Sequence, residues 1–130
     1  MMDQPYQRKP RMGFDTGRHQ SSNHVTFDDG AEIARNFPWT HFVEARWSRL
    51  EPDLIEVDIG EWSVAIRGHN LGPLFEAIED GTLLRVRPRL EMQGQPDWTI
   101  DTFATEIRFR KTGPSLPVRR RGQTELDLGV

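Results

Sequence analysis

Apolar and polar side chains alternate along residues 54–67, and this alternation is the clearest pattern in the chain. The apolar positions are Ile55, Val57, Ile59, Trp62, Val64 and Ile66. A period of two predicts strands over 54–59 and 62–67. Gly60 and Glu61 lie between these strands, and glycine at the first position suits a type II′ turn. The pattern therefore predicts a β-hairpin.

A different period follows the hairpin. The apolar residues are now spaced as on one face of a helix: Leu71, Leu74, Phe75 and Ile78. Asn70 or Gly72 can cap the start of this helix, Pro73 suits its first turn, and Gly81 can end it in a left-handed conformation. A helix of about ten residues is not stable alone, so we expect it to pack against a sheet.

Alternation returns after the helix and predicts two more strands, over 82–92 and 98–111, joined by a turn at 93–97. The inward positions of the first strand are Leu84, Val86, Leu90 and Met92. Pro88 lacks a backbone donor, so this strand is expected at a sheet edge or with a bulge. The parity of the second strand changes near Asp101 and Thr102, which predicts a bulge there.

The segment before the hairpin is less regular. Residues 28–30 form a turn or cap signal, and Ala31–Asn36 is compatible with one helical turn that ends at Pro38. Residues 39–50 alternate and are rich in aromatic and β-branched side chains, which favours a strand. The pattern leaves open whether residues 25–50 contribute a strand of the sheet or a helix.

Together these elements predict an α+β domain over residues 25–112. Its mainly antiparallel sheet has about five strands, one short helix packs on one face, and the order is β-β-β-α-β-β. Residues 1–24 and 113–130 have few aliphatic side chains and are predicted to be disordered tails.

Composition excludes several classes of protein. The chain has no cysteine, so disulfides, thiol nucleophiles and cysteine-bound metal centres are excluded. No apolar run approaches 18 residues, and the first residues lack the apolar core of a signal peptide. We therefore expect a soluble, cytoplasmic protein without a membrane partner.

The net charge of −3 is unevenly distributed. Residues 1–27 carry four basic and two acidic side chains, residues 28–106 seven and sixteen, and residues 107–130 six and two. The resulting charges are +2, −9 and +4. An acidic body argues against a domain that itself coats nucleic acid, but the basic ends leave such binding possible.

The main candidate binding site is a set of outward arginines on the predicted sheet: Arg67, Arg85, Arg87, Arg89, Arg108 and Arg110. This Arg face could hold phosphates or an acidic partner. It could instead be a solvated face, because Glu106 is expected opposite Arg85 or Arg87. The face lacks outward aromatic residues on which bases would stack.

A secondary candidate is the turn Gly68–Pro73, where His69 and Asn70 lead into the predicted helix and an anion could bind. The turn matches no phosphate-loop or dinucleotide motif. The four histidines have no metal-ligand spacing, no cofactor signature is present, and no serine lies in a nucleophile elbow. We therefore expect no metal, no cofactor and no catalytic residue, and a non-enzymatic protein is favoured.

Three functions remain open. The favoured one is a binding or assembly module that acts through protein–protein contacts or self-association, using a strand edge, the Arg face or a surface with tryptophans. The four tryptophans are Trp39, Trp47, Trp62 and Trp98, and all but Trp62 are candidates for partial exposure. The alternatives are nucleic-acid binding by the Arg face and tails, and a ligand site or enzyme at Gly68–Pro73. The last requires a concave surface beside His69.

Overall fold

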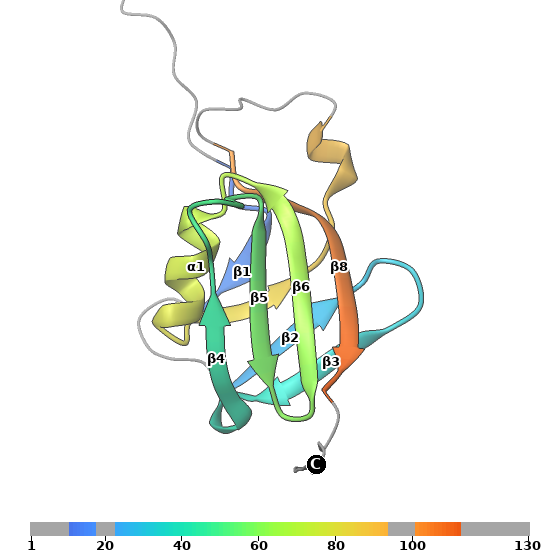
Figure 1. Cartoon of the computed structure of the whole chain (residues 1–130). Helices are drawn as coiled ribbons and strands as arrows, with labels where there is room; N and C mark the ends of the chain where they lie inside the picture. Colours follow the sequence, from blue (N-terminus) through green and yellow to red (C-terminus); the bar gives the residue numbers. More distant parts are fainter. Residues whose placement is uncertain (1–10, 18–22, 94–100, 113–130) are drawn as a thin grey trace, which may run out of the picture.

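A computed structural model describes residues 11–17, 23–93 and 101–112 of the chain. It is a mixed α+β structure, formed mostly by strands in two four-stranded sheets, with one α-helix (Figure 1). The strands are β1 (Phe14–Thr16), β2 (His24–Asp28), β3 (Ala34–Pro38), β4 (Phe42–Arg46), β5 (Leu54–Ile59), β6 (Trp62–His69), β7 (Leu83–Val86) and β8 (Phe103–Lys111). The helix is α1 (Gly72–Glu79), and short 3₁₀ helices span Trp39–His41 and Leu90–Gln93.

The first sheet has the order β4-β5-β6-β8, and all its neighbours are antiparallel. It contains the predicted hairpin, in which Ile55 pairs with Ile66 and Val57 with Val64. Gly60 has a φ of +59°, as glycine at the first position of a type II′ turn requires. The hairpin prediction is confirmed. The sequence could indicate this hairpin because its alternation and its turn glycine lie within a few neighbouring residues.

The second sheet has the order β1-β7-β2-β3, and its strands cross behind β5 and β6 in Figure 1. β7 pairs antiparallel with β1 and parallel with β2. The prediction of a single sheet of about five strands in the order β-β-β-α-β-β is therefore wrong. β7 and β8 were expected to form a hairpin, but α1 carries the chain from the first sheet to the second, so they belong to different sheets.

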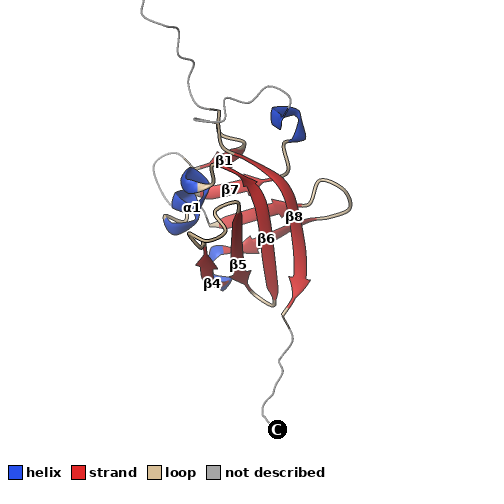
Figure 2. Ribbon diagram, turned by 45° about the horizontal axis from the view of Figure 1, so that its top comes forward, coloured by secondary structure: helices blue, strands red, loops and turns tan. Residues whose placement is uncertain are grey.

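The hydrophobic core joins both sheets and the helix. Its fully buried members include Val25 and Phe27 of β2, Ile55, Val57 and Ile59 of β5, and Leu83 and Val86 of β7. Leu74, Ala77 and Ile78 bring α1 into the same core. The helix lies at the side of the molecule, near β1, and not over the middle of a sheet (Figures 1 and 2).

The predicted apolar stripe of the helix is confirmed, because Leu71, Leu74 and Ile78 are buried. The prediction of the cap is wrong. Leu71 occupies the position before the helix, and no side chain accepts a hydrogen bond from the first turn. Gly81 follows the helix with a φ of +68°, as expected of a glycine that ends a helix.

The N-terminal half differs most from the prediction. β1 and the bridge from Met12 to Thr102 lie inside the segment expected to be a tail, so residues 12–16 are part of the fold. Residues 31–36 form no helical turn. The Asp29 carboxylate instead accepts hydrogen bonds from the backbone N–H groups of residues 31–33, and this loop joins β2 to β3.

The strand expected over residues 39–50 is also divided. Its first part is the 3₁₀ helix Trp39–His41, and only Phe42–Arg46 forms β4. Val43 is 68 % exposed, because the register with β5 shifts between Phe42 and Glu44. At this edge strand, alternation in the sequence does not correspond to burial.

Two further expectations need correction. The bulge lies at Thr105, between the pairs Arg67–Glu106 and Gly68–Ala104, and not near Asp101 and Thr102. On β7, Leu83 and Val86 are buried while Leu84 is exposed, so strict alternation fails there. The predictions for residues 94–100, including Trp98, and for the whole second tail (113–130) lie outside the described residues.

Arg35 of β3 links the two sheets. Its guanidinium carbon lies 3.7 Å from the centre of the Trp62 ring and 5.2 Å from that of Phe109. Trp62 and Phe109 meet edge to face, with their centres 6.3 Å apart. Trp62 is half-buried, and its ring packs against a cation from the other sheet.

Within the described residues, no helix is both long and apolar enough to cross a membrane.

Candidate binding surface around Trp47

The structure does not bring the six predicted arginines to one face. Arg67, Arg108 and Arg110 lie on β6 and β8 of the first sheet, while Arg85 lies on β7 of the second. Arg87 and Arg89 follow β7 outside any strand. Glu106 pairs across the strands with Arg67, and not with Arg85 or Arg87 as expected. The continuous Arg face is therefore absent.

Most of these arginines have carboxylate partners. Arg67 contacts Glu51 at 3.1 Å and Asp53 at 3.2 Å. Arg108 pairs with Glu106, and Arg85 lies 3.6 Å from Asp28. The outer face of the first sheet is open, and its hollow of about 370 Å³ is lined by charges of both signs. It has the features of a solvated face with cross-strand ion pairs.

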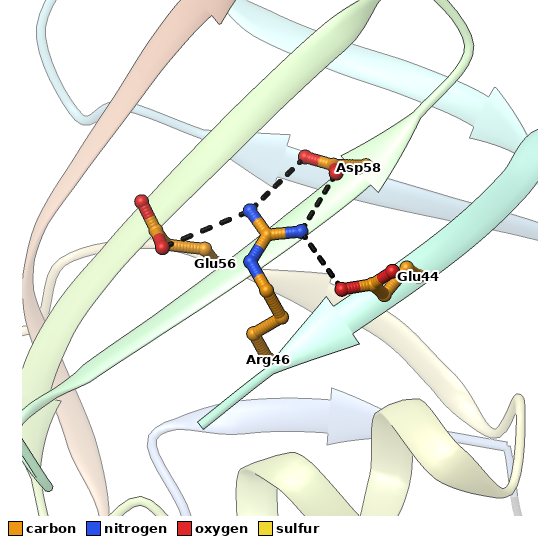
Figure 3. Close-up of polar contacts among 4 residues, drawn as sticks. All are labelled: Glu44, Arg46, Glu56 and Asp58. Carbon is orange, nitrogen blue, oxygen red and sulfur yellow. Dashed lines mark hydrogen bonds and ion pairs between the residues drawn. The ribbon is translucent and has the colours of Figure 1, made fainter. Parts of the chain in front are cut away.

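Three carboxylates surround Arg46 on β4 (Figure 3). Its guanidinium lies 2.7 Å from Asp58, 3.1 Å from Glu44 and 3.7 Å from Glu56. The hydrogen bond from Arg46 lowers the pKa of Asp58 below its ordinary value. One cation thus holds three carboxylates together on β4 and β5.

We expect Arg46→Gln to destabilise the protein by about 1 kcal/mol at neutral pH, because three carboxylates would lose their shared cation on a partly exposed surface. The folded-state pKa of Asp58 is below its unfolded value. The pair therefore stabilises the protein fully above about pH 4, and this contribution is lost as the pH falls through the folded-state pKa. Urea unfolding at several pH values should show a loss of unfolding free energy, relative to wild type, that becomes smaller in acid.

Arg108→Gln is the matched control and should have little effect on stability. A loss of stability for Arg46→Gln that does not change with pH would contradict the expectation.

A hollow of about 470 Å³ lies beside the loop that follows β4. It is lined by Trp47, Ser48, Arg49, Pro52 and Phe75. The Trp47 indole N–H donates to the Pro52 carbonyl at 2.9 Å, and the ring lies 5.5 Å from the Phe75 ring of α1. Trp47 is nevertheless 38 % exposed. The structure thus holds a large aromatic side chain in a fixed orientation while leaving part of it open.

A second hollow of about 320 Å³ is also lined by Trp47 and Pro52. The other lining residues are Asp53, Gly68, His69, Asn70, Leu71 and Gly72. Asn70 has a φ of +53°, a left-handed conformation that asparagine tolerates, and its carbonyl accepts a hydrogen bond from Thr102. His69 therefore lies in the wall of a shallow hollow, which adjoins the larger hollow lined by Trp47 and Phe75 (the Trp47 hollow).

The sequence prediction named His69 and Asn70 but missed most of this surface. Trp47 was recognised only as a tryptophan that could be partly buried. Ser48, Arg49 and Pro52 lie in a loop, where no periodicity marks them, and Phe75 was assigned to the helix stripe. Within the residues described, no group of three His, Asp or Glu side chains could hold a metal ion.

Comparison with known proteins finds no matching family model, no similar curated protein and no similar solved structure.

Proposed function

We propose that this protein is a non-enzymatic binding domain that holds an apolar side chain of a partner protein in the hollow between Trp47, Pro52 and Phe75. The observation that carries the proposal is the Trp47 indole. It is oriented by a hydrogen bond and by Phe75, yet it remains partly exposed between two adjoining hollows.

Such an arrangement is typical of the residues that dominate protein interfaces. Tryptophan is enriched among them because it buries a large apolar area and loses little conformational freedom. Here the indole N–H already has its partner, the Pro52 carbonyl, so an apolar group can cover the ring without leaving a polar atom unpaired. The surface is thus prepared for an apolar contact.

The second candidate is a small ligand in the adjoining hollow. The observation that favours it is the position of His69 and Asn70 in the wall of that hollow, where they could donate or accept hydrogen bonds. Fragment binding that is lost in His69→Ala, while peptide binding persists, would support this candidate. Nucleic-acid binding has less support, because Arg67, Arg85 and Arg108 already face carboxylates.

The proposal is tested by selecting peptides from a random phage-displayed library on the wild-type protein. Trp47→Ala is expected to weaken the selected peptides at least about tenfold, because it removes most of the apolar wall. Trp47→Phe should retain part of the affinity. Val43→Ser changes an exposed apolar residue that does not line either hollow, so it should bind as the wild type does.

Urea unfolding of each variant establishes that it is folded before affinities are compared. Failure to select any peptide, or peptides that bind wild type and Trp47→Ala equally, would refute the proposal.

A further inference from the structure

We infer that the partner segment carries an acidic residue close to its apolar one, and that Arg49 selects this residue. The inference rests on the proposed function, since it concerns the occupant of the Trp47 hollow.

Arg49 differs from most other arginines of the described chain in its surroundings. Arg87 and Arg110 also lack an ion pair among the described residues, but they line neither hollow. Arg11, Arg46, Arg67, Arg85, Arg89 and Arg108 each contact a carboxylate. Arg35 packs on Trp62. Arg49 is exposed in the wall of the hollow, and within the described ranges it has neither an ion pair nor a hydrogen bond. Its guanidinium is therefore available to a partner.

An occupant of the hollow changes the hydration of this cation. A side chain that covers Trp47 and Phe75 also displaces water from Arg49, since all three line the same hollow. A charge that loses water without gaining a partner opposes binding. A carboxylate can accept two parallel hydrogen bonds from a guanidinium, so an acidic residue in the partner removes this penalty.

The carboxylates near the two hollows do not require an opposite charge from an occupant. Asp53 lines the second hollow but is already 3.2 Å from Arg67. Glu76 and Glu79 are exposed on α1 and line neither hollow, so an occupant can leave them hydrated. Arg49 is thus the charged side chain of the larger hollow that an occupant must satisfy. The matching partner is a peptide segment with an apolar side chain and an aspartate or glutamate a few residues away.

The test compares peptide selections on wild type and on Arg49→Glu. Wild-type peptides should be enriched in Asp or Glu near an aromatic or aliphatic residue, and Arg49→Glu should favour Lys or Arg instead. A wild-type peptide should bind Arg49→Glu about tenfold more weakly, and its affinity for wild type should fall with salt. Arg49→Lys should keep part of the affinity. Arg110→Glu, a charge reversal on β8 away from the hollow, should have little effect.

The outcomes separate the two proposals. Peptides that depend on Trp47 but bind Arg49→Glu as well as wild type, or that are enriched in basic residues, would overturn the inference and leave the proposed function intact. The absence of any Trp47-dependent peptide would refute both.

Discussion

Gly68→Ala is expected to lower the free energy of unfolding by about 3 kcal/mol or more. Gly68 lies on β6 opposite Ala104 of β8, next to the bulge at Thr105. A Cβ atom at Gly68 would overlap the carbonyl oxygen of Phe103 and lie 2.8 Å from the Cα of Ala104. Both obstacles are backbone atoms of β8, which is paired with β6, so neither can move without disturbing this pairing. Denaturation by urea, followed by far-ultraviolet circular dichroism, measures the effect.

Gly72→Ala provides the matched control from the same turn. A Cβ there would lie 3.5 Å from the Trp47 ring, an ordinary contact, and alanine suits the helix better than glycine. We expect this variant to be as stable as the wild type or slightly more stable. Equal losses for both variants would show that backbone flexibility, and not steric overlap, determines the effect at Gly68. Gly68 thus has a structural role at the edge of the candidate surface.

Asp101→Ala is expected to destabilise the protein by about 3 kcal/mol, because it removes a buried carboxylate that accepts three charge-assisted or backbone hydrogen bonds from Arg11. The Asp101 side chain is fully buried. Its carboxylate accepts the Arg11 backbone N–H at 3.0 Å and the Arg11 guanidinium at 2.9 and 3.2 Å. Backbone hydrogen bonds from Thr102 to Arg11 and from Gly13 to Thr102 continue this contact. The substitution should therefore release the segment that leads into β1.

Asp15→Ala is the control, because it removes an exposed carboxylate from β1 itself and should change stability little. Arg11→Ala should also destabilise the protein, and the double variant Arg11→Ala/Asp101→Ala should be clearly more stable than the sum of the single effects implies. Amide hydrogen exchange in residues 13–16 should accelerate in Asp101→Ala. Additive losses of stability, with the hydrogen-exchange protection of β1 unchanged, would show that the Arg11–Asp101 contact does not hold β1 in place.

The success of the sequence predictions follows the distance over which each contact acts. The β5–β6 hairpin and the apolar stripe of α1 were predicted because strand period, turn glycine and helix period are all contained in about ten neighbouring residues. β1 was missed because only three residues pair, and their partner, β7, lies about 70 residues further along the chain. The link between Arg11 and Asp101 spans 90 residues, and no local pattern indicates it.

The candidate surface shows the same division. His69 and Asn70 were predicted because they stand between a strand and a helix, whereas Trp47, Arg49 and Pro52 come from a loop that only tertiary packing places beside them. The expected Arg face failed because it required β7 and β8 to be partners. α1 instead carries β7 into the second sheet, where β7 buries Leu83 and Val86 in the common core.

The sequence by itself determined the β5–β6 hairpin, the helix and the α+β class, because side-chain periodicity and turn residues act between neighbours. Only the tertiary structure decided the division into two sheets, the pairing of β1 with β7 in the second sheet, and the ion pairs of most arginines with carboxylates. It also left Trp47 and Arg49 together at an open hollow. These outcomes depend on which surfaces bury the most apolar area in the folded chain. The buried area depends on contacts between distant segments, so the sequence of a single segment does not determine it.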